Sequence, residues 1–204
     1  SMTGNEPFMG NTNSMDMVLT NDAVLTWLWS TNYLLDASAL VGGSVTGDPY
    51  GFYEEESSVS VTAVPDLGYE FVGWTGDVGA VPGDATQTLL MDQPRALVAE
   101  FAAIELTLEI ISDHGVATPP VGIYTHDYGT LLTNSVSDME TIGDTRYINT
   151  GWSMTGNEPF TGNTNRMDMV LTNDAVLTWL WSTNYLLDAS ALEGGTVTGD
   201  PNGF

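Results

Sequence analysis

Two histidines are the first candidates for catalytic chemistry, because each stands beside an aspartate: His114 follows Asp113, and His126 precedes Asp127. A His–Asp pair can activate a nucleophile or bind a metal ion. Both histidines lie in turn-like segments, and the sequence contains neither a Gly-x-Ser-x-Gly elbow nor a His-Glu-x-x-His motif. We therefore expect structural roles for both and predict that the chain is not an enzyme. A carboxylate pair of the glycosidase type stays open on sequence alone.

Acidic loops are the second candidate, because carboxylates and loop carbonyls could together supply the oxygen ligands that Ca²⁺ prefers. Three groups stand out: Asp77 with Asp84; Glu54, Glu55 and Glu56; and Asp138, Glu140 and Asp144. None follows an EF-hand loop or a tandem glycine-rich nonapeptide. Specific Ca²⁺ sites, loose cation association and no binding stay as alternatives. We assign no catalytic, cofactor-binding or metal-ligating residue.

Aromatic residues are the third candidate, for surface glycans. In an extended strand Leu25, Trp27, Trp29 and Tyr33 share one face. An exposed aromatic row could stack on sugar rings. The alternative is that these side chains form a module core or pack at a joint, because small modules need the area that aromatic residues bury. We predict burial, and the same for the motif Tyr69–Trp74.

The charge balance excludes several partners. The 204 residues include 27 Asp and Glu but only three basic residues, Arg95, Arg146 and Arg166, which gives a net charge of −24. Nucleic acids and anionic membranes require clustered Lys and Arg, so we expect neither as a partner. No apolar run is long enough to span a membrane. The chain has no cysteine, hence no disulfide, and its 42% hydrophobic residues are typical of folded cores.

The arrangement of these candidate residues in the fold depends on an internal repeat of the sequence. Residues 1–52 return as residues 153–204, an offset of 152, without a gap and with only five differences. The differing pairs are Met9/Thr161, Ser14/Arg166, Val41/Glu193, Ser44/Thr196 and Tyr50/Asn202. Such self-similarity is typical of a repeat array. We interpret the chain as a window of one and a third periods from a longer array.

Two repeat types alternate within one period. Hydrophobic alternation of period 2 recurs, no helical stripe does, and turn residues separate the strand signals. The predicted divisions are the end of a type-A repeat (1–33), a complete type-B repeat (34–103), a complete type-A repeat (104–185) and the start of another type-B repeat (186–204). A short helical turn around residues 137–141 is left open.

The joints between repeats lack the Gly- and Ser-rich composition of flexible linkers. Residues 23–40 and 95–112 contain no Gly or Pro. We therefore expect strands that run from one module directly into the next. The predicted fold is mainly β, with small open-sheet modules joined by continuous strands into a rod.

Residues 34–103 resemble the divergent internalin-B B-repeat, a repeat of bacterial surface proteins. The resemblance rests on residues 43–53, on 59–76 with its Ala-Val-Pro-Asp-x-Gly-Tyr-x-Phe-x-Gly-Trp pattern, and on Ala-x-Phe before residue 102. It implies a small β-grasp-like or open β module in extracellular proteins, used as spacer, stalk or adhesive array, with no catalytic residues. Residues 186–204 begin a further copy, and residues 104–185 are a distant relative.

These observations predict a structural repeat segment of a large extracellular surface or filament protein that acts as a stiff stalk, spacer or adhesive fibre. The expected partners are neighbouring repeats or identical chains in a filament. The alternative is an array that binds carbohydrate or Ca²⁺, in which repetition multiplies weak affinity. Accessible Trp27 and Trp29, or stabilisation by Ca²⁺, would favour that alternative.

Overall fold

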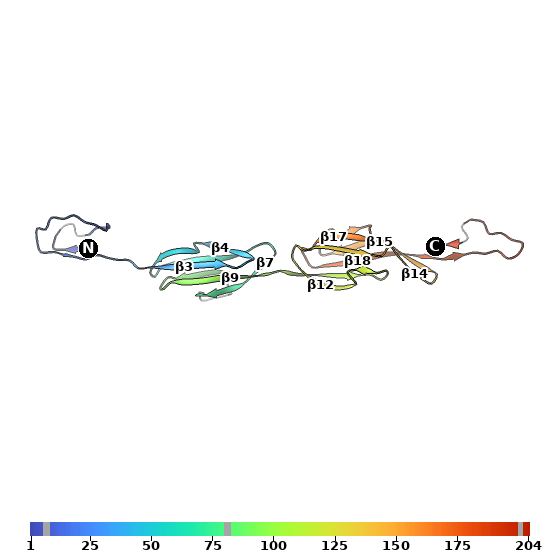
Figure 1. Ribbon diagram of the computed structural model, residues 1–204, viewed down its shortest axis with the longest axis horizontal. Coiled ribbons are helices and arrows are strands. Elements are labelled where there is room, and N and C mark those ends of the chain that lie inside the picture. The colour runs from blue at the N-terminus through green and yellow to red at the C-terminus, as the bar shows by residue number, and fades with distance from the viewer. Residues whose placement is uncertain (6–8, 80–82, 200–201) are drawn as a thin grey trace. The chain divides into compact units, whose positions relative to one another are not determined.

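A computed structural model describes residues 1–5, 9–79, 83–199 and 202–204. All regular structure in these ranges is β-strand (Figure 1), which confirms the prediction of a mainly β fold. No apolar helix of membrane-spanning length occurs within the same ranges. The chain forms two compact units: Ser1–Val64 with Phe71–Glu100 make unit 1, and Pro65–Glu70 with Phe101–Phe204 make unit 2.

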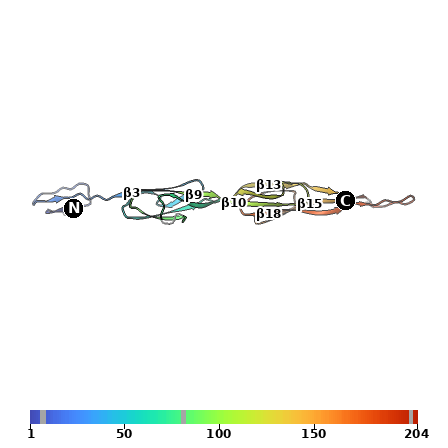
Figure 2. The same ribbon diagram turned by 90° about the horizontal axis from the view of Figure 1, so that it is seen from below.

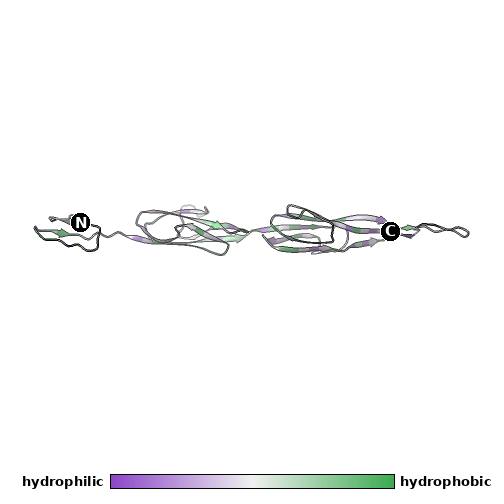
Figure 3. Ribbon diagram, turned by 90° about the horizontal axis from the view of Figure 1, so that it is seen from above, coloured by the Kyte–Doolittle hydropathy of each residue, from purple (hydrophilic) through white to green (hydrophobic). Residues whose placement is uncertain are grey.

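The strands follow from alternation of apolar and polar residues. In the sequence Ser-Val-Ser-Val-Thr-Ala-Val-Pro of residues 58–65, Val59, Val61 and Ala63 are buried while Ser58 and Ser60 are exposed. Successive side chains of a strand point to opposite faces, so this pattern buries one face. Figure 3 shows hydrophobic and hydrophilic residues interspersed along the strands in the same way.

The first nine strands lie within residues 1–103. They are β1 (Met2–Thr3), β2 (Val24–Leu25), β3 (Asn32–Ala39), β4 (Gly43–Gly47), β5 (Tyr50–Glu54), β6 (Ser58–Pro65), β7 (Tyr69–Gly76), β8 (Thr86–Leu90) and β9 (Arg95–Ala103). β1 pairs with β2; the others form a four-stranded sheet in the order β5-β3-β9-β7 and a three-stranded sheet in the order β4-β6-β8.

Both larger sheets bury apolar side chains. The four-stranded sheet buries Leu35, Ala37, Trp74, Leu97 and Ala99, and the three-stranded sheet with its flank buries Val59, Val61, Ala63, Leu89 and Met91. Trp74 is also fixed by a 3.1 Å hydrogen bond from its indole N–H to the carbonyl of Ala85. These residues form a two-layer β module.

The remaining strands lie in unit 2. They are β10 (Glu105–Ile111), β11 (Ala117–Thr118), β12 (Gly122–Asp127), β13 (Leu131–Val136), β14 (Met139–Ile142), β15 (Thr145–Thr155), β16 (Thr161–Gly162), β17 (Arg166–Val170), β18 (Ala175–Tyr185), β19 (Leu187–Asp188) and β20 (Asn202–Gly203). One sheet has the order β12-β10-β18-β15-β14 with β16 beside β15, a second has the order β11-β13-β17, and β19 pairs with β20.

A single hydrophobic cluster joins the first two of these sheets, whose strands β18 and β13 lie in separate layers (Figure 2). Its buried members are Leu108, Ile110, Ala117, Val136, Trp152, Met154, Met167, Met169, Leu171, Ala175, Leu177 and Trp179. The first five come from residues 104–152 and the other seven from residues 153–185. Neither half of this module can bury its apolar face without the other half.

The helical turn left open around residues 137–141 is wrong. Met139–Ile142 is strand β14, which pairs with β15 in a hairpin whose last pair is Ile142 with Thr145. Gly143 lies in the turn at φ +58°, a conformation that glycine adopts without steric cost. The tight turn at Gly143 therefore favours a β-hairpin over a helical turn in these residues.

Candidate functional site

The most informative geometry of residues 32–103 is the pairing of their first and last strands. β3 and β9 are adjacent and parallel, with Leu35 opposite Arg95 and Ala39 opposite Ala99. A further hydrogen bond of 3.0 Å, from the Leu40 N–H to the Ala99 carbonyl, extends the ladder. Parallel pairing means that the chain enters at one end of this sheet and leaves at the opposite end.

Residues 105–185 use the same arrangement. β10 is their first strand and β18 their last; the two are parallel, with Leu108 opposite Ala175 and Ile111 opposite Thr178. Just before β18, the Asp174 carboxylate accepts hydrogen bonds from the Thr107 N–H at 2.8 Å and the Thr107 hydroxyl at 3.0 Å. These bonds, the backbone one foremost, hold the pKa of Asp174 below its ordinary value.

The residue between β9 and β10 is hydrogen-bonded on both sides. The Ile104 N–H donates to the Gly68 carbonyl at 2.9 Å, and the Tyr128 N–H donates to the Ile104 carbonyl at 2.9 Å. Gly68 has φ +85°, and a Cβ there would come within 2.9 Å of the Tyr128 ring. All three residues belong to unit 2. Strand geometry is thus interrupted by only one residue here, and that residue is fixed.

The repeated segments allow the same sequence to be compared in two settings. The register Met2–Leu25 and Thr3–Val24 in β1 and β2 recurs as Met154–Leu177 and Thr155–Val176 in β15 and β18. The pairing of β1 with β2 therefore repeats that part of the pairing of β15 with β18.

A buried asparagine fixes this local fold in both copies. The Asn157 side-chain carbonyl accepts from the Thr172 N–H at 2.8 Å, and its amide donates to the Val170 carbonyl at 3.0 Å. Asn5 makes the corresponding bonds to Thr20 at 3.1 Å and Val18 at 2.9 Å. Sequence reasoning missed both asparagines, because near-identical copies repeat every residue and so single out none.

What differs between the copies is burial. Leu177 and Trp179 are 0% and 2% exposed, whereas their counterparts Leu25 and Trp27 are 41% and 49% exposed. Trp29 is 92% exposed, and its counterpart Trp181 is half-buried against the core of unit 2. The predicted burial is therefore confirmed for Leu177 and Trp179 and in part for Trp181. It is wrong for Tyr185, which is 73% exposed, and for Trp27 and Trp29.

The continuous strand predicted between residues 1–33 and the type-B repeat is interrupted, because strands that flank β18 have no counterpart beside residues 26–31. β18 runs unbroken from Ala175 to Tyr185 between two partner strands, β10 and β15. In the corresponding residues 23–33, β2 ends at Leu25 and β3 begins only at Asn32. Residues 26–31 lack the two flanking strands whose backbone hydrogen bonds keep β18 extended.

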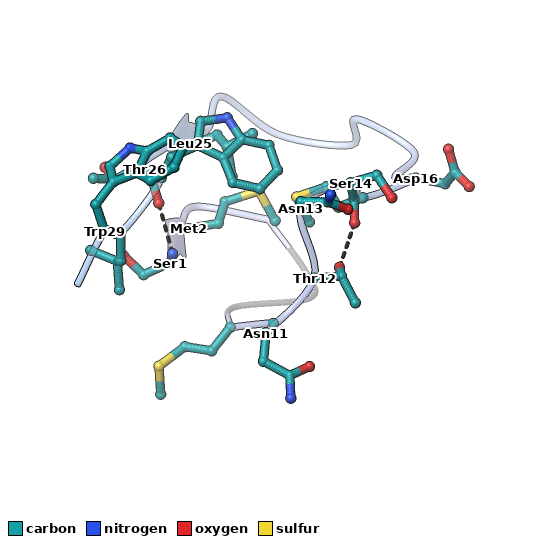
Figure 4. A pocket seen from close by; sticks show the side chains of 15 residues that line it. Ser1, Met2, Asn11, Thr12, Asn13, Ser14, Asp16, Leu25, Thr26 and Trp29 are labelled. Carbon is teal, nitrogen blue, oxygen red and sulfur yellow. Dashed lines mark hydrogen bonds between the residues drawn. The ribbon is translucent and has the colours of Figure 1, made fainter. Parts of the chain in front are cut away.

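The uncovered side of residues 1–33 encloses a hollow of about 790 Å³ (Figure 4). Met2, Leu25 and Trp29 form one wall, and the segment from Asn11 to Ser14 lies across from them. The hollow is apolar on the wall that carries the repeated aromatic residues.

Several of the acidic candidates accept local hydrogen bonds. Asp77 accepts from the Ala96 N–H at 2.9 Å, and Asp138 accepts from the Asn165 amide at 2.6 Å. Glu140 accepts from the Gly115 N–H at 3.1 Å. In the described part of the chain, no three Asp, Glu or His side chains gather closely enough to hold a metal ion. Ca²⁺ binding stays an untested prediction.

Neither histidine belongs to a cluster of three potential metal ligands in the described residues. His114 contacts Glu140 at 3.2 Å and stacks on the Tyr147 ring with a centroid distance of 3.4 Å. The Ser112 hydroxyl nearby donates to the His114 backbone carbonyl and accepts from the Trp181 indole. His126 lies in β12, opposite Leu106 of β10. The His114 contacts thus connect the segment after β10 with β14 and β15.

Comparison with known proteins supports the sequence resemblance. Residues 33–105 match the family described as the divergent InlB B-repeat domain. No curated protein and no solved structure matches the chain. Together with the repeated segments, the match makes this chain a β-rich repeat protein.

Proposed function

Taking residues 33–105 as a divergent InlB B-repeat domain, we propose that the chain is a segment of an extracellular bacterial surface or filament protein that serves as a stiff stalk or spacer. In this function the repeats provide length, because each repeat advances the chain by the length of its sheet. No reaction is needed, and none of the described side chains is assigned to one.

The observation that carries this proposal is the parallel pairing of first and last strands, β3 with β9 and β10 with β18. A chain that enters and leaves a module at opposite ends is displaced by that module in one direction. A pull on the two ends also loads the hydrogen bonds of the parallel pair in shear, all at once, because both strands lie along the pull. Such a pair resists extension better than a hairpin that opens one bond at a time.

The charge distribution supports the same function. Arg95 and Arg166 pair with Asp92 and Asp168 at 2.6 and 3.1 Å. The Arg146 guanidinium carbon lies 4.0 Å from the centre of the Phe204 ring. The 27 Asp and Glu exceed the three basic residues by 24, so most of the negative charge is not neutralised within the chain. Neighbouring stalks of this composition repel one another, which prevents lateral association.

The proposal predicts how length depends on repeat number. Leu35 is level with Arg95, and Leu108 is level with Ala175, so only residues 95–108 and 175–187 advance the chain along the strand direction within one period. These two segments give roughly 25 residue steps per period. At about 3.3 Å per step, each added period lengthens the molecule by about 80 Å. Chains with one, two and three copies of residues 34–185 are to be measured by electron microscopy and small-angle X-ray scattering.

A matched control is an array with a Gly/Ser insertion between Ala103 and Ile104, which should be shorter on average because the joint becomes a flexible coil. Constant increments near the stated value in the uninterrupted array support the stalk. Increments below half that value, or no difference from the control, would exclude it.

A further inference from the structure

Arg146 has an unusual partner for a chain with 27 acidic residues. Arg95 and Arg166 each pair with an aspartate. The Arg146 guanidinium carbon instead lies 4.0 Å from the centre of the Phe204 ring, and no Asp or Glu of the described ranges forms an ion pair with Arg146. A guanidinium over an aromatic ring is attracted by the ring, and more strongly where water is excluded. The Nε atom of Arg146 is buried, so this contact is shielded from water.

The two partners come from different predicted repeats. Arg146 lies in β15, close to the turn of the β14–β15 hairpin, and belongs to the type-A repeat 104–185. Phe204 belongs to residues 186–204, which repeat the start of the type-B sequence, residues 34–52. The contact therefore crosses the boundary between a type-A repeat and the type-B sequence that follows it in the same chain.

A backbone hydrogen bond crosses the same boundary. In the ladder of β15 with β18, Thr145 lies opposite Tyr185, the last residue of β18. The next residue, Leu186, donates its N–H to the Asp144 carbonyl at 2.8 Å. The hairpin thus holds the following sequence by two contacts, one from the backbone of Asp144 and one from the side chain of Arg146.

The Phe204 ring is placed as in a complete type-B repeat. β19 and β20 pair in the same register as β3 and β5, their counterparts in residues 34–52. Phe52, the counterpart of Phe204, is 71% exposed, so the core of the type-B module does not use this ring. Phe204, which carries the Arg146 contact, is 39% exposed. The ring is therefore available on the surface of a type-B module for a contact with a neighbouring module.

The hairpin that carries Arg146 is itself fixed to the type-A module. Glu140 of β14 accepts a hydrogen bond from the Gly115 N–H at 3.1 Å and contacts the His114 ring at 3.2 Å. Tyr147 of β15 stacks on the same His114 ring. A contact made from a fixed support costs less conformational entropy than one made from a free loop.

We propose that the β14–β15 hairpin of a type-A repeat is the docking site for the type-B repeat that follows it in the same chain. Arg146 binds the phenylalanine at the position of Phe204, and the Asp144 carbonyl binds the N–H at the position of Leu186. Two contacts from one hairpin restrict rotation about the joint, which the covalent link alone does not. This inference rests on the stalk proposed above and specifies a contact that keeps one of its joints stiff.

The test uses the full chain and nuclear magnetic resonance measurement of hydrogen exchange at the Leu186 amide, which bonds to Asp144. Arg146→Ala and Phe204→Ala should each accelerate this exchange about threefold to thirtyfold, as for loss of a shielded cation–π contact. Because both changes remove the same contact, the double variant should exchange no faster than the faster single variant.

Two matched controls accompany these variants. Arg166→Ala removes another arginine of the same repeat, and Phe52→Ala removes the counterpart of Phe204; each should change the exchange of Leu186 less than about twofold. No acceleration in Phe204→Ala, effects that multiply in the double variant, or an equal effect of Arg166→Ala would overturn the proposal.

Exchange of the β10 amides shows whether the type-A module stays folded, and it should be the same in all variants. Should Arg146→Ala disturb β10, Phe204→Ala decides alone, because it changes no residue of 104–185. None of these outcomes depends on how length grows with repeat number. The docking contact and the stalk are therefore tested separately.

Discussion

Replacing Leu177 by alanine should lower the unfolding free energy of unit 2 by about 2–5 kcal/mol, whereas the same change at Leu25 should cost about 0.5 kcal/mol or less. The two leucines stand in identical local sequences and in the same strand register. Leu177 is fully buried in the shared core, and Leu25 is 41% exposed. The difference in cost therefore measures what the covering half, residues 104–152, contributes.

Hydrogen exchange read by mass spectrometry resolves the effect. Residues 17–33 and 169–185 are identical in sequence, so their peptides cannot be told apart, but β10 (Glu105–Ile111) occurs once. Exchange of β10 amides should accelerate about thirtyfold to several thousandfold in Leu177→Ala and stay unchanged in Leu25→Ala. Equal protection of β10 in the two variants would contradict the shared core.

Gly151→Ala is the second large effect that we expect, with a loss of more than about 3 kcal/mol. Gly151 has φ +126° in β15, where the register with β18 shifts. A Cβ at this position would collide with the backbone carbonyl of Gly162 and with Asn163. Since the collision is with backbone, relief would require β16 to move away from β15.

The control for Gly151 is Gly143→Ala. Gly143 also has a positive φ, +58°, but a Cβ there would meet nothing within 4 Å, so the cost should be only the conformational one of about 1–2 kcal/mol. Urea unfolding followed by circular dichroism compares the midpoints. Similar midpoints for the two variants would show that the close approach of β16 does not constrain the fold.

The sequence predicts the strands and their buried faces because both depend on local alternation. Val59, Val61 and Ala63 give the buried face of β6 directly. The parallel pairings do not follow in the same way: Leu35 lies opposite Arg95, and no local pattern specifies a partner at that distance along the chain. The hairpin of β14 and β15 could have been predicted from Gly143-Asp144, a pair typical of two-residue hairpin turns.

The aromatic residues show why burial is harder to predict than strand position. Trp27 and Trp179 have the same neighbours in sequence, yet one is 49% exposed and the other 2%. Their burial is set by residues 104–152, which pair only with the second copy. Trp27 and Trp29 thus stand in a copy of the segment that has no such half beside it in this sequence.

Pulling a multi-repeat array by its ends in a single-molecule force experiment tests the mechanical role of the parallel strand pairs most directly. Unfolding of residues 34–103 and 104–185 should appear as separate force peaks. The expected length gains are about 220 and 240 Å, which are the extended lengths at about 3.5 Å per residue less the folded lengths. Leu40→Pro removes the N–H that bonds to Ala99 and should lower the peak force of the first kind only, while Leu40→Ala leaves it unchanged. Smooth extension without peaks, or peaks that Leu40→Pro does not alter, would contradict the account.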